Sequence, residues 1–112
     1  MDTPTTMTQK TDVPFDKVLF NLNRLFIVQE IAKRDSVVWR DLRDALLLTD
    51  GNLARHLHVL EEHGLIELKK EFRDRKSCTT YWLTRKGQAT FWRLKLWFTS
   101  TFIDEPKEGE KK

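Results

Sequence analysis

The stretch that decides the fold runs from Trp39 to Ile66 and reads WRDLRDALLLTDGNLARHLHVLEEHGLI. It contains two amphipathic segments, in each of which leucine or alanine recurs at the three-and-four spacing of one buried helical stripe. The stripe of the first segment is Leu42, Ala45 and Leu46. The stripe of the second is Leu53, Leu57 and Leu60. The sequence therefore predicts two short helices, each with one face packed and the other free.

A tight turn at residues 48–51 separates the two predicted helices. Thr49 suits the N-cap, because its hydroxyl can accept a hydrogen bond from the backbone N–H of Asn52. Asp50 in the first turn suits the positive end of the helix dipole. The second helix is expected over about 50–63, ended by His63 and Gly64, with Gly64 in the left-handed C′ position. The whole stretch is thus a helix-turn-helix.

Downstream of this unit, residues 65–72 and 77–83 are β-prone and flank the tetrapeptide Arg73-Asp74-Arg75-Lys76. They predict a hairpin with a charged tip. Residues 69–76 hold five basic and two acidic side chains, so this segment has the same net charge of +3 as the whole chain. The hairpin tip is therefore a local basic feature suited to a polyanion such as nucleic acid.

After the hairpin, Thr84 is the expected cap of a last helix that runs from about Arg85 to residue 102 or 103.

Upstream, Asn23 is the expected cap of a helix over 24–33, and residues 15–22 form either a separate turn or part of the same helix. The predicted buried stripe of the helix over 24–33 is Leu25, Val28, Ile31 and Ala32. Val37-Val38 is long enough only for a small edge strand, and we expect Trp39, which follows it, to be a packing residue.

The 112 residues suffice for one domain, expected over 14–103, between a disordered arm (1–13) and a disordered charged tail (104–112). The single cysteine, Cys78, excludes an intramolecular disulfide and a multi-cysteine metal cage. No signal peptide or membrane-spanning run is evident, so we expect a cytoplasmic protein that does not contact a membrane. Neither a metal site nor a cofactor is expected.

The predicted fold class is mainly α with a small β-hairpin (α+β). The order of the predicted elements is that of a winged helix-turn-helix with a long C-terminal helix. Over about residues 19–98 the chain resembles winged-helix transcriptional regulators of the MarR/ArsR-like group. The resemblance is carried by Asn23-Arg24-Leu25, by residues 48–57 with Leu60 and Gly64-Leu65-Ile66, and by Leu83-Thr84-Arg85-Lys86-Gly87. It implies that the helix over 50–63 is the recognition helix, lying in the major groove, and that the hairpin is a wing on the backbone or in the minor groove.

Asn52 and Arg55 are the preferred base-reading candidates, because Asn can pair bidentately with adenine and Arg with guanine. Gly51 would allow close approach of a phosphate to the backbone. The full set of predicted DNA-contact residues is Thr49, Gly51, Asn52, Arg55, His56, His58, Arg73, Arg75 and Lys76, with Trp39 and Arg40 as further phosphate-contact candidates. For His56, which borders the buried face, local packing remains an equal alternative. His58 could be merely solvated, and the wing tip could be an ordinary charged turn.

The last helix has two apolar stripes about 140° apart, and one small core does not explain both. The first stripe is Ala89, Trp92, Leu96 and Ile103. The second is Phe91, Leu94, Phe98 and Phe102. Because an exposed contiguous apolar face usually marks an interface, we predict a two-fold homodimer. Its predicted interface residues are Leu19, Phe20, Phe91, Leu94, Phe98 and Phe102; the alternative is that residues 15–20 of the same chain cover this face.

These features predict a sequence-specific regulator of transcription that binds double-stranded DNA as a homodimer. One alternative is a winged-helix module that binds an acidic protein through its basic wing. Another is a regulator that responds to redox state through Cys78 or to a small-molecule effector. An enzyme is not expected, because the sequence contains no Gly-rich phosphate loop, nucleophile motif or clear pair of catalytic carboxylates.

Overall fold

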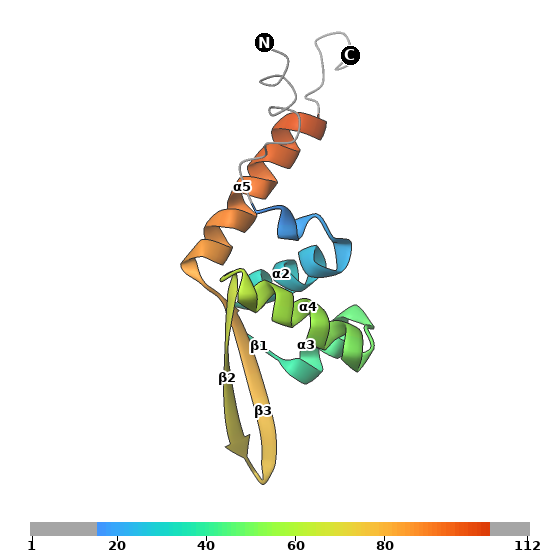
Figure 1. The fold of residues 1–112 in the computed structure, drawn as a ribbon, viewed down its shortest axis with the longest axis vertical. Coiled ribbons are helices and arrows are strands. Elements are labelled where there is room, and N and C mark those ends of the chain that lie inside the picture. Colours follow the sequence, from blue (N-terminus) through green and yellow to red (C-terminus); the bar gives the residue numbers. More distant parts are fainter. Residues whose placement is uncertain (1–15, 104–112) are drawn as a thin grey trace, which may run out of the picture.

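Residues 16–103 are described in the computed structural model of the protein, and they combine helices with one small antiparallel sheet (Figure 1). The elements in chain order are η1 (Lys17–Leu19), α2 (Leu22–Arg34), β1 (Val37–Val38), α3 (Trp39–Leu46), α4 (Asp50–Glu62), β2 (Ile66–Arg73), β3 (Lys76–Leu83) and α5 (Arg85–Phe102). The α+β winged helix-turn-helix predicted from the sequence is confirmed. The predicted disordered segments, 1–13 and 104–112, lie outside the described residues.

The start of α2 differs from the sequence prediction. Its N-cap is Asn21, whose side chain accepts a hydrogen bond from the backbone N–H of Arg24 at 3.1 Å, so the prediction of Asn23 as the cap is wrong. Asp16 caps the separate 3-10 turn η1 by accepting from the Val18 N–H at 3.0 Å. Two polar caps five residues apart thus break this region into a turn and a helix.

The helix-turn-helix forms as predicted, with Thr49 as the N-cap of α4 and its hydroxyl 3.2 Å from the backbone nitrogen of Asn52. The α4 stripe Leu53, Leu57 and Leu60 is buried. In α3, Leu42 is fully buried but Ala45 is exposed, so the predicted stripe is narrower than expected. The packed face of α4 fixes its orientation in the domain and leaves its opposite face in solvent.

The three strands lie in the order β1-β3-β2, and both pairings are antiparallel. The β2–β3 hairpin, called the wing below, runs from the pair Ile66–Leu83 at the body to Arg73–Lys76 at its end. Asp74 and Arg75 alone make the turn, and both have positive φ, as in a two-residue type I′ loop. The strands therefore extend farther than predicted, and Figure 1 shows the wing projecting well beyond the helices.

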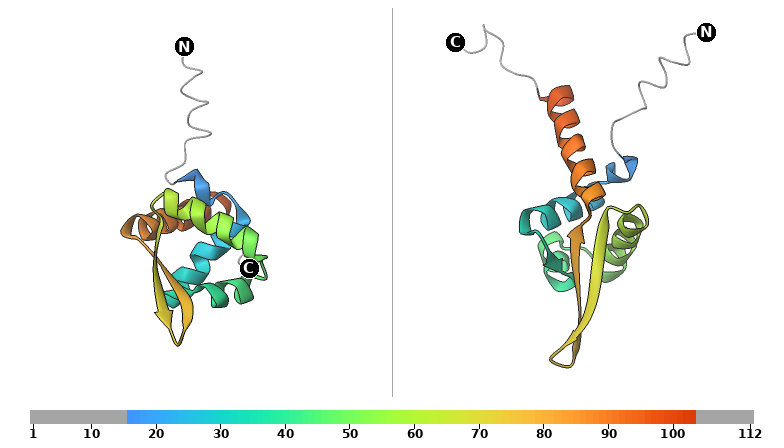
Figure 2. Two further views of the ribbon diagram at one scale, coloured as in Figure 1. Left: turned by 60° about the horizontal axis from the view of Figure 1, so that its bottom comes forward. Right: turned by 90° about the vertical axis from the view of Figure 1, so that its left-hand side faces the viewer.

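Helix α5 begins at the Thr84 cap, whose hydroxyl accepts from the Gly87 N–H at 2.9 Å and donates to the Gly64 carbonyl at 2.6 Å. A Cβ at position 87 would lie 2.0 Å from the Leu65 carbonyl oxygen, so only glycine permits this close approach. From that junction α5 leaves the body at the end opposite the wing (Figure 2).

The core lies between α2, α3, α4 and the inner face of the sheet, and the first half of α5 closes one side of it. Phe91 and Leu94 belong to this core, as does Leu19 of η1. Three of the residues predicted for an exposed dimer face, Leu19, Phe91 and Leu94, are therefore buried within the protomer, and the expectation that they are exposed is wrong. The expectation holds for Phe20 and for the outer part of the α5 stripe, Phe98 and Phe102, which are exposed.

Candidate nucleic-acid interface

The exposed face of α4 presents the two residues predicted to read bases. Asn52 and Arg55 lie one helical turn apart, both are exposed, and Arg55 Nη2 donates to Asn52 Oδ1 at 3.1 Å. Beside them, a Cβ on Gly51 would meet no atom within 4 Å, so packing does not require glycine there. This end of α4 therefore combines an exposed glycine backbone with a preformed pair of hydrogen-bonding side chains.

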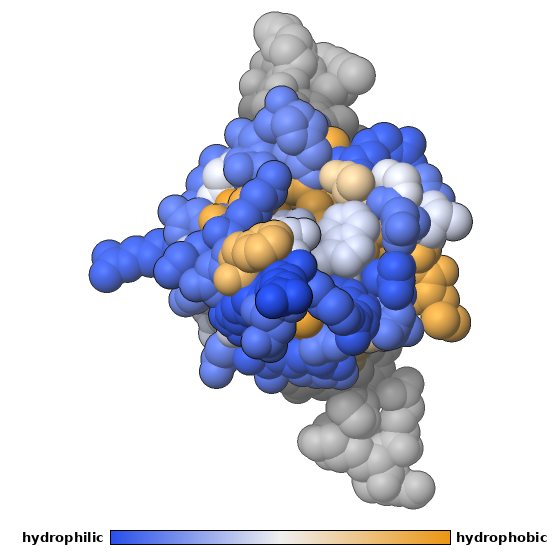
Figure 3. Space-filling model, turned by 90° about the horizontal axis from the view of Figure 1, so that it is seen from below, coloured by the Kyte–Doolittle hydropathy of each residue, from blue (hydrophilic) through white to orange (hydrophobic). Residues whose placement is uncertain are grey.

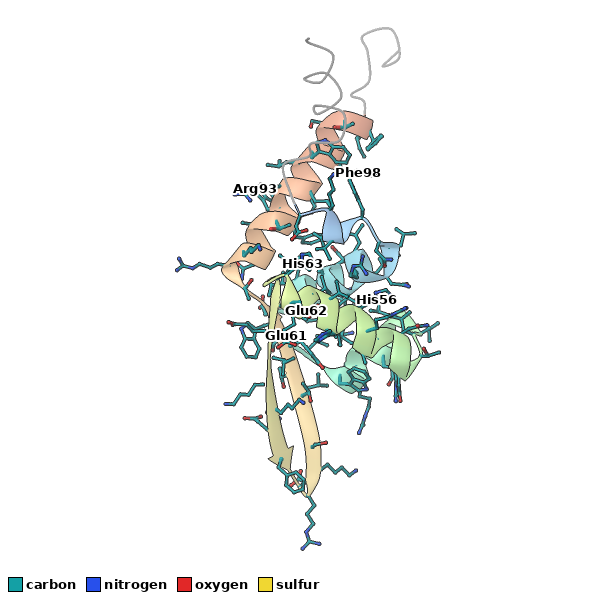
Figure 4. The ribbon with its side chains drawn as sticks, in the orientation of Figure 1. His56, Glu61, Glu62, His63, Arg93 and Phe98 are labelled. Atoms are coloured by element: carbon teal, nitrogen blue, oxygen red, sulfur yellow. The ribbon has the colours of Figure 1, made fainter. Side chains whose placement is uncertain are left out.

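His56 is 4% exposed and faces α2, so it is not on the surface that Asn52 and Arg55 share (Figure 4). Its Nδ1 lies 3.3 Å from Arg24 Nη1, and its Nε2 lies 3.5 Å from the Asn23 amide. Because guanidinium only donates hydrogen bonds, Nδ1 is the unprotonated acceptor. Burial, together with the charges of Arg24 and Arg55, lowers the pKa of the His56 imidazole. The packing interpretation of His56 is the one that the structure supports.

His58 and His63 are both exposed but have different partners. His58 Nε2 lies 3.2 Å from Glu62 on the same helix, which makes it a solvated surface pair. His63 Nδ1 lies 3.0 Å from Asp16, so the C-terminal end of α4 is linked to η1. The sequence did not suggest this second contact, because 47 residues separate its partners.

The cations of the wing are not equivalent. Arg73 forms hydrogen bonds with Glu71, and these bonds, with that from Lys69, lower the pKa of the Glu71 carboxyl. Arg75 and Lys76, in contrast, form no ion pair with any residue of 16–103. Their charge is therefore available to an external anion, whereas that of Arg73 is partly neutralised.

A groove of about 580 Å³ separates the wing from the start of α3. Four cations line it, two on each side, and two of the four are neutralised: Arg73 by Glu71, and Arg43 by Asp50 at 3.3 Å and Asp44 at 3.5 Å. Within the described range, Arg40 and Lys76 have no carboxylate partner. They face the groove from opposite sides, which sequence reasoning missed because the two residues are far apart in the chain.

Viewed from the wing end, the surface is mostly hydrophilic (Figure 3).

Half-buried Cys78 lines the groove between the wing and α3 as a free thiol. Among residues 16–103, no three His, Cys, Asp or Glu side chains gather as a metal-ligand set, and no helix is both long and apolar enough to cross a membrane.

At the other end of the molecule, an apolar groove of about 440 Å³ lies between α5 and the η1–α2 segment. Phe98 and Phe102 lie on its outer rim, with ring centroids 5.0 Å apart. Figure 4 shows Phe98 and Arg93 on opposite sides of α5. The remaining lining residues are Leu19, Phe20, Asn21, Leu22, Leu25, Leu94 and Trp97. Of the six predicted dimer residues, Phe20, Phe98 and Phe102 retain substantial exposed surface.

The family model described as winged helix DNA-binding domain matches residues 23–101. A transcriptional regulator homologue from Pyrococcus horikoshii has 28% identity and a TM-score of 0.65, over 79% of this chain and 91% of that one. MarR has 20% identity and a TM-score of 0.60, over 96% and 84% of the two chains. An uncharacterized protein of Methanocaldococcus jannaschii is 44% identical over 50 residues, 45% of this chain and 54% of the relative. The match thus spans about half the length of this curated relative.

Proposed function

The chain belongs to the winged helix DNA-binding domain family, whose fold it shares with MarR-like transcriptional regulators, and we propose that it is a sequence-specific regulator of transcription. The family and these regulators are described by DNA binding and transcription, not by an enzymatic reaction. The observation that carries the proposal is the groove between α3 and the wing, where Arg40 and Lys76 present unneutralised charge beside the helix-turn-helix.

In the proposed complex, α4 enters the major groove with its N-terminal end toward the bases. The Asn52–Arg55 hydrogen bond would be exchanged for bonds to base edges, adenine for Asn52 and guanine for Arg55. Thr49 keeps its capping role and Gly51 admits a phosphate close to the helix backbone. His56 acts by holding α4 against α2, not by touching DNA.

The wing and α3 hold one phosphate backbone between them. Arg40 approaches it from α3, while Arg75 and Lys76 approach it from the end of the wing. Such contacts give affinity and register without reading sequence, and each cation that replaces a counterion adds to the salt dependence of binding. Arg73 contributes less, because binding a phosphate would require it to leave Glu71.

We propose further that the protein binds as a homodimer through the end of α5. Phe98 and Phe102 are exposed beside an apolar groove, and Phe20 and Leu22 extend the same surface onto the η1–α2 segment. Burying such a surface against a second copy would be favourable. Two recognition helices related by two-fold symmetry would then read a pseudo-palindromic site.

The test is selection of bound duplexes from a random library, followed by titration of the selected site at several salt concentrations. We expect a pseudo-palindromic consensus and a steep, linear fall of log K with log salt. Arg55→Ala should abolish the preference for the selected site while retaining nonspecific binding; Lys76→Gln should weaken both equally. If wild-type protein shifts no duplex even at low salt, DNA binding is refuted.

The same variants test the interaction-module alternative. An acidic protein partner would depend on the wing cations but not on the side chains of Asn52 and Arg55. Loss of DNA site preference on changing either of these two residues therefore supports major-groove reading and excludes a purely electrostatic role for the wing.

A further inference from the structure

Phe72 is the feature of the wing that DNA-backbone binding does not explain. Its side chain is 74% exposed, one residue before the cations of the wing tip. Alternation along β2 places it on the same face as Ile66 and Leu68, which pack against the body. By position 72 the strand has passed beyond the helices, and the residue paired with it on β3 is Ser77. The ring therefore continues the inner apolar face into solvent without adding to the core.

The surroundings of this ring are cationic. Lys70 shares its face two residues earlier, and Arg75 and Lys76 follow at the end of the hairpin. Within residues 16–103 none of these three cations forms an ion pair. A partner that suits both the ring and the cations offers apolar surface next to negative charge. A DNA duplex does so, because its stacked bases lie between two phosphate strands.

We propose that Phe72 is an apolar wedge that enters the minor groove between two adjacent base pairs and bends the duplex. The inference rests on the proposed DNA-binding function and specifies what the wing does there. Lys70, Arg75 and Lys76 hold the phosphates on either side, while the ring replaces part of the stacking between the separated base pairs. Flexible pyrimidine–purine steps are easiest to open, so the wedge adds sequence preference at a position that no side chain reads by hydrogen bonds.

The test measures bending directly. A duplex carrying the selected site is labelled at its two ends with a donor and an acceptor dye, and energy transfer is recorded at saturating protein. Wild-type protein should bend the duplex by roughly 20–90°, the range found for wedge-inserting proteins. Phe72→Ala should leave it nearly straight and weaken binding about tenfold, whereas Phe72→Leu should retain the bend, because leucine also serves as a wedge.

Lys70→Gln is the matched control, because it changes the same face of the wing without removing the ring. It should reduce the slope of log K against log salt by about 0.9 for each wing that contacts DNA, with an unchanged bend at saturation. Thermal unfolding of Phe72→Ala should match that of wild-type protein, since the ring is mostly exposed. Equal melting temperatures show that a lost bend does not come from an unfolded hairpin.

Two outcomes separate this inference from the proposed function. If wild-type protein binds the duplex and Phe72→Ala bends it equally, the wedge is refuted and DNA binding stands. If wild-type protein shifts no duplex, both are refuted. A preference of TA over A-tract steps at the wing position, lost in Phe72→Ala, would support the wedge independently of the dyes.

Discussion

Arg75→Gly should change folding stability and DNA affinity in opposite directions. Arg75 has φ +65° in the two-residue turn, a conformation that glycine adopts without steric cost. For an L side chain the left-handed conformation costs about 1–2 kcal/mol. Glycine recovers that energy but gains about 0.5–1 kcal/mol of conformational freedom in the unfolded chain. The net expectation is a gain of about 0.5–1 kcal/mol in the free energy of unfolding, a rise of a few degrees in melting temperature.

The same substitution removes a cation that we place on a phosphate. One phosphate contact contributes about 0.9 to the slope of log K against log salt. That slope corresponds to about fivefold in affinity at 0.15 M salt and about fifteenfold at 0.05 M for each wing. A dimer engaging both wings should therefore lose about 1.8 in slope. The slope change reports both the contact and the number of wings that make it.

Two further variants separate charge from backbone conformation. Arg75→Gln removes the charge but retains the left-handed cost, so it should bind as weakly as Arg75→Gly without the gain in stability. Arg75→Lys should match wild-type protein in both properties. Arg85→Gln, at the start of α5, removes an equal charge far from the wing tip and should leave the slope unchanged. An unchanged slope in Arg75→Gly refutes the phosphate contact, and a lower melting temperature refutes the argument from backbone strain.

Four other predictions follow from single features of the described residues. Gly51→Ala should raise the free energy of unfolding by about 0.5–1 kcal/mol, because alanine favours the helix and its methyl group would meet no atom. The same substitution should weaken DNA binding, because the methyl group would keep a phosphate away from the helix backbone. His56 has a lowered pKa when folded, so it binds fewer protons than in the unfolded chain. Denaturant titrations should therefore show full stability above pH 6.5 and a loss as the pH falls below that value, with a smaller loss in His56→Gln. Phe98→Lys should give a folded monomer by light scattering with about half the salt slope on the selected site, because Phe98 is 47% exposed. Phe91→Ala instead should cost about 3–5 kcal/mol of stability, because that ring is in the protomer core.

Local patterns in the sequence predicted the helix-turn-helix, the Thr49 cap and the hairpin, because each depends on residues within a few positions of one another. The cap of α2 was misplaced by two residues, since Asn21 and Asn23 are equally good caps by type. The sequence could not predict that Asn23 and Arg24 contact His56, because these contacts join positions more than thirty residues apart.

The two faces of α5 illustrate a limit of helical periodicity. A wheel identifies two apolar stripes but cannot say how far along the helix the body of the domain extends. In the structure that boundary crosses the second stripe, so Phe91 and Leu94 are buried and Phe98 and Phe102 are not. The backbone of Gly87 packs closely against the Leu65 carbonyl, and this junction fixes the direction in which α5 leaves the domain. Only the tertiary structure could divide the stripe.

Three exposed positions are occupied by residue types that the fold alone would not favour. Gly51 lies within the first turn of a helix, Arg75 adopts a left-handed conformation, and Phe72 exposes an aromatic ring without covering the core. A substitution at each would improve folding or solubility, so stability does not account for the residues present. All three lie on α4 or the wing, the two elements that we place against DNA, although Asp35 also has a positive φ and Phe26 and Trp92 are also exposed aromatic residues. Leu47 shares this property, with φ +56° and 88% exposure in the turn before α4. Backbone conformation and exposure, as well as charge, therefore favour α4, the turn before it and the wing as the proposed interface.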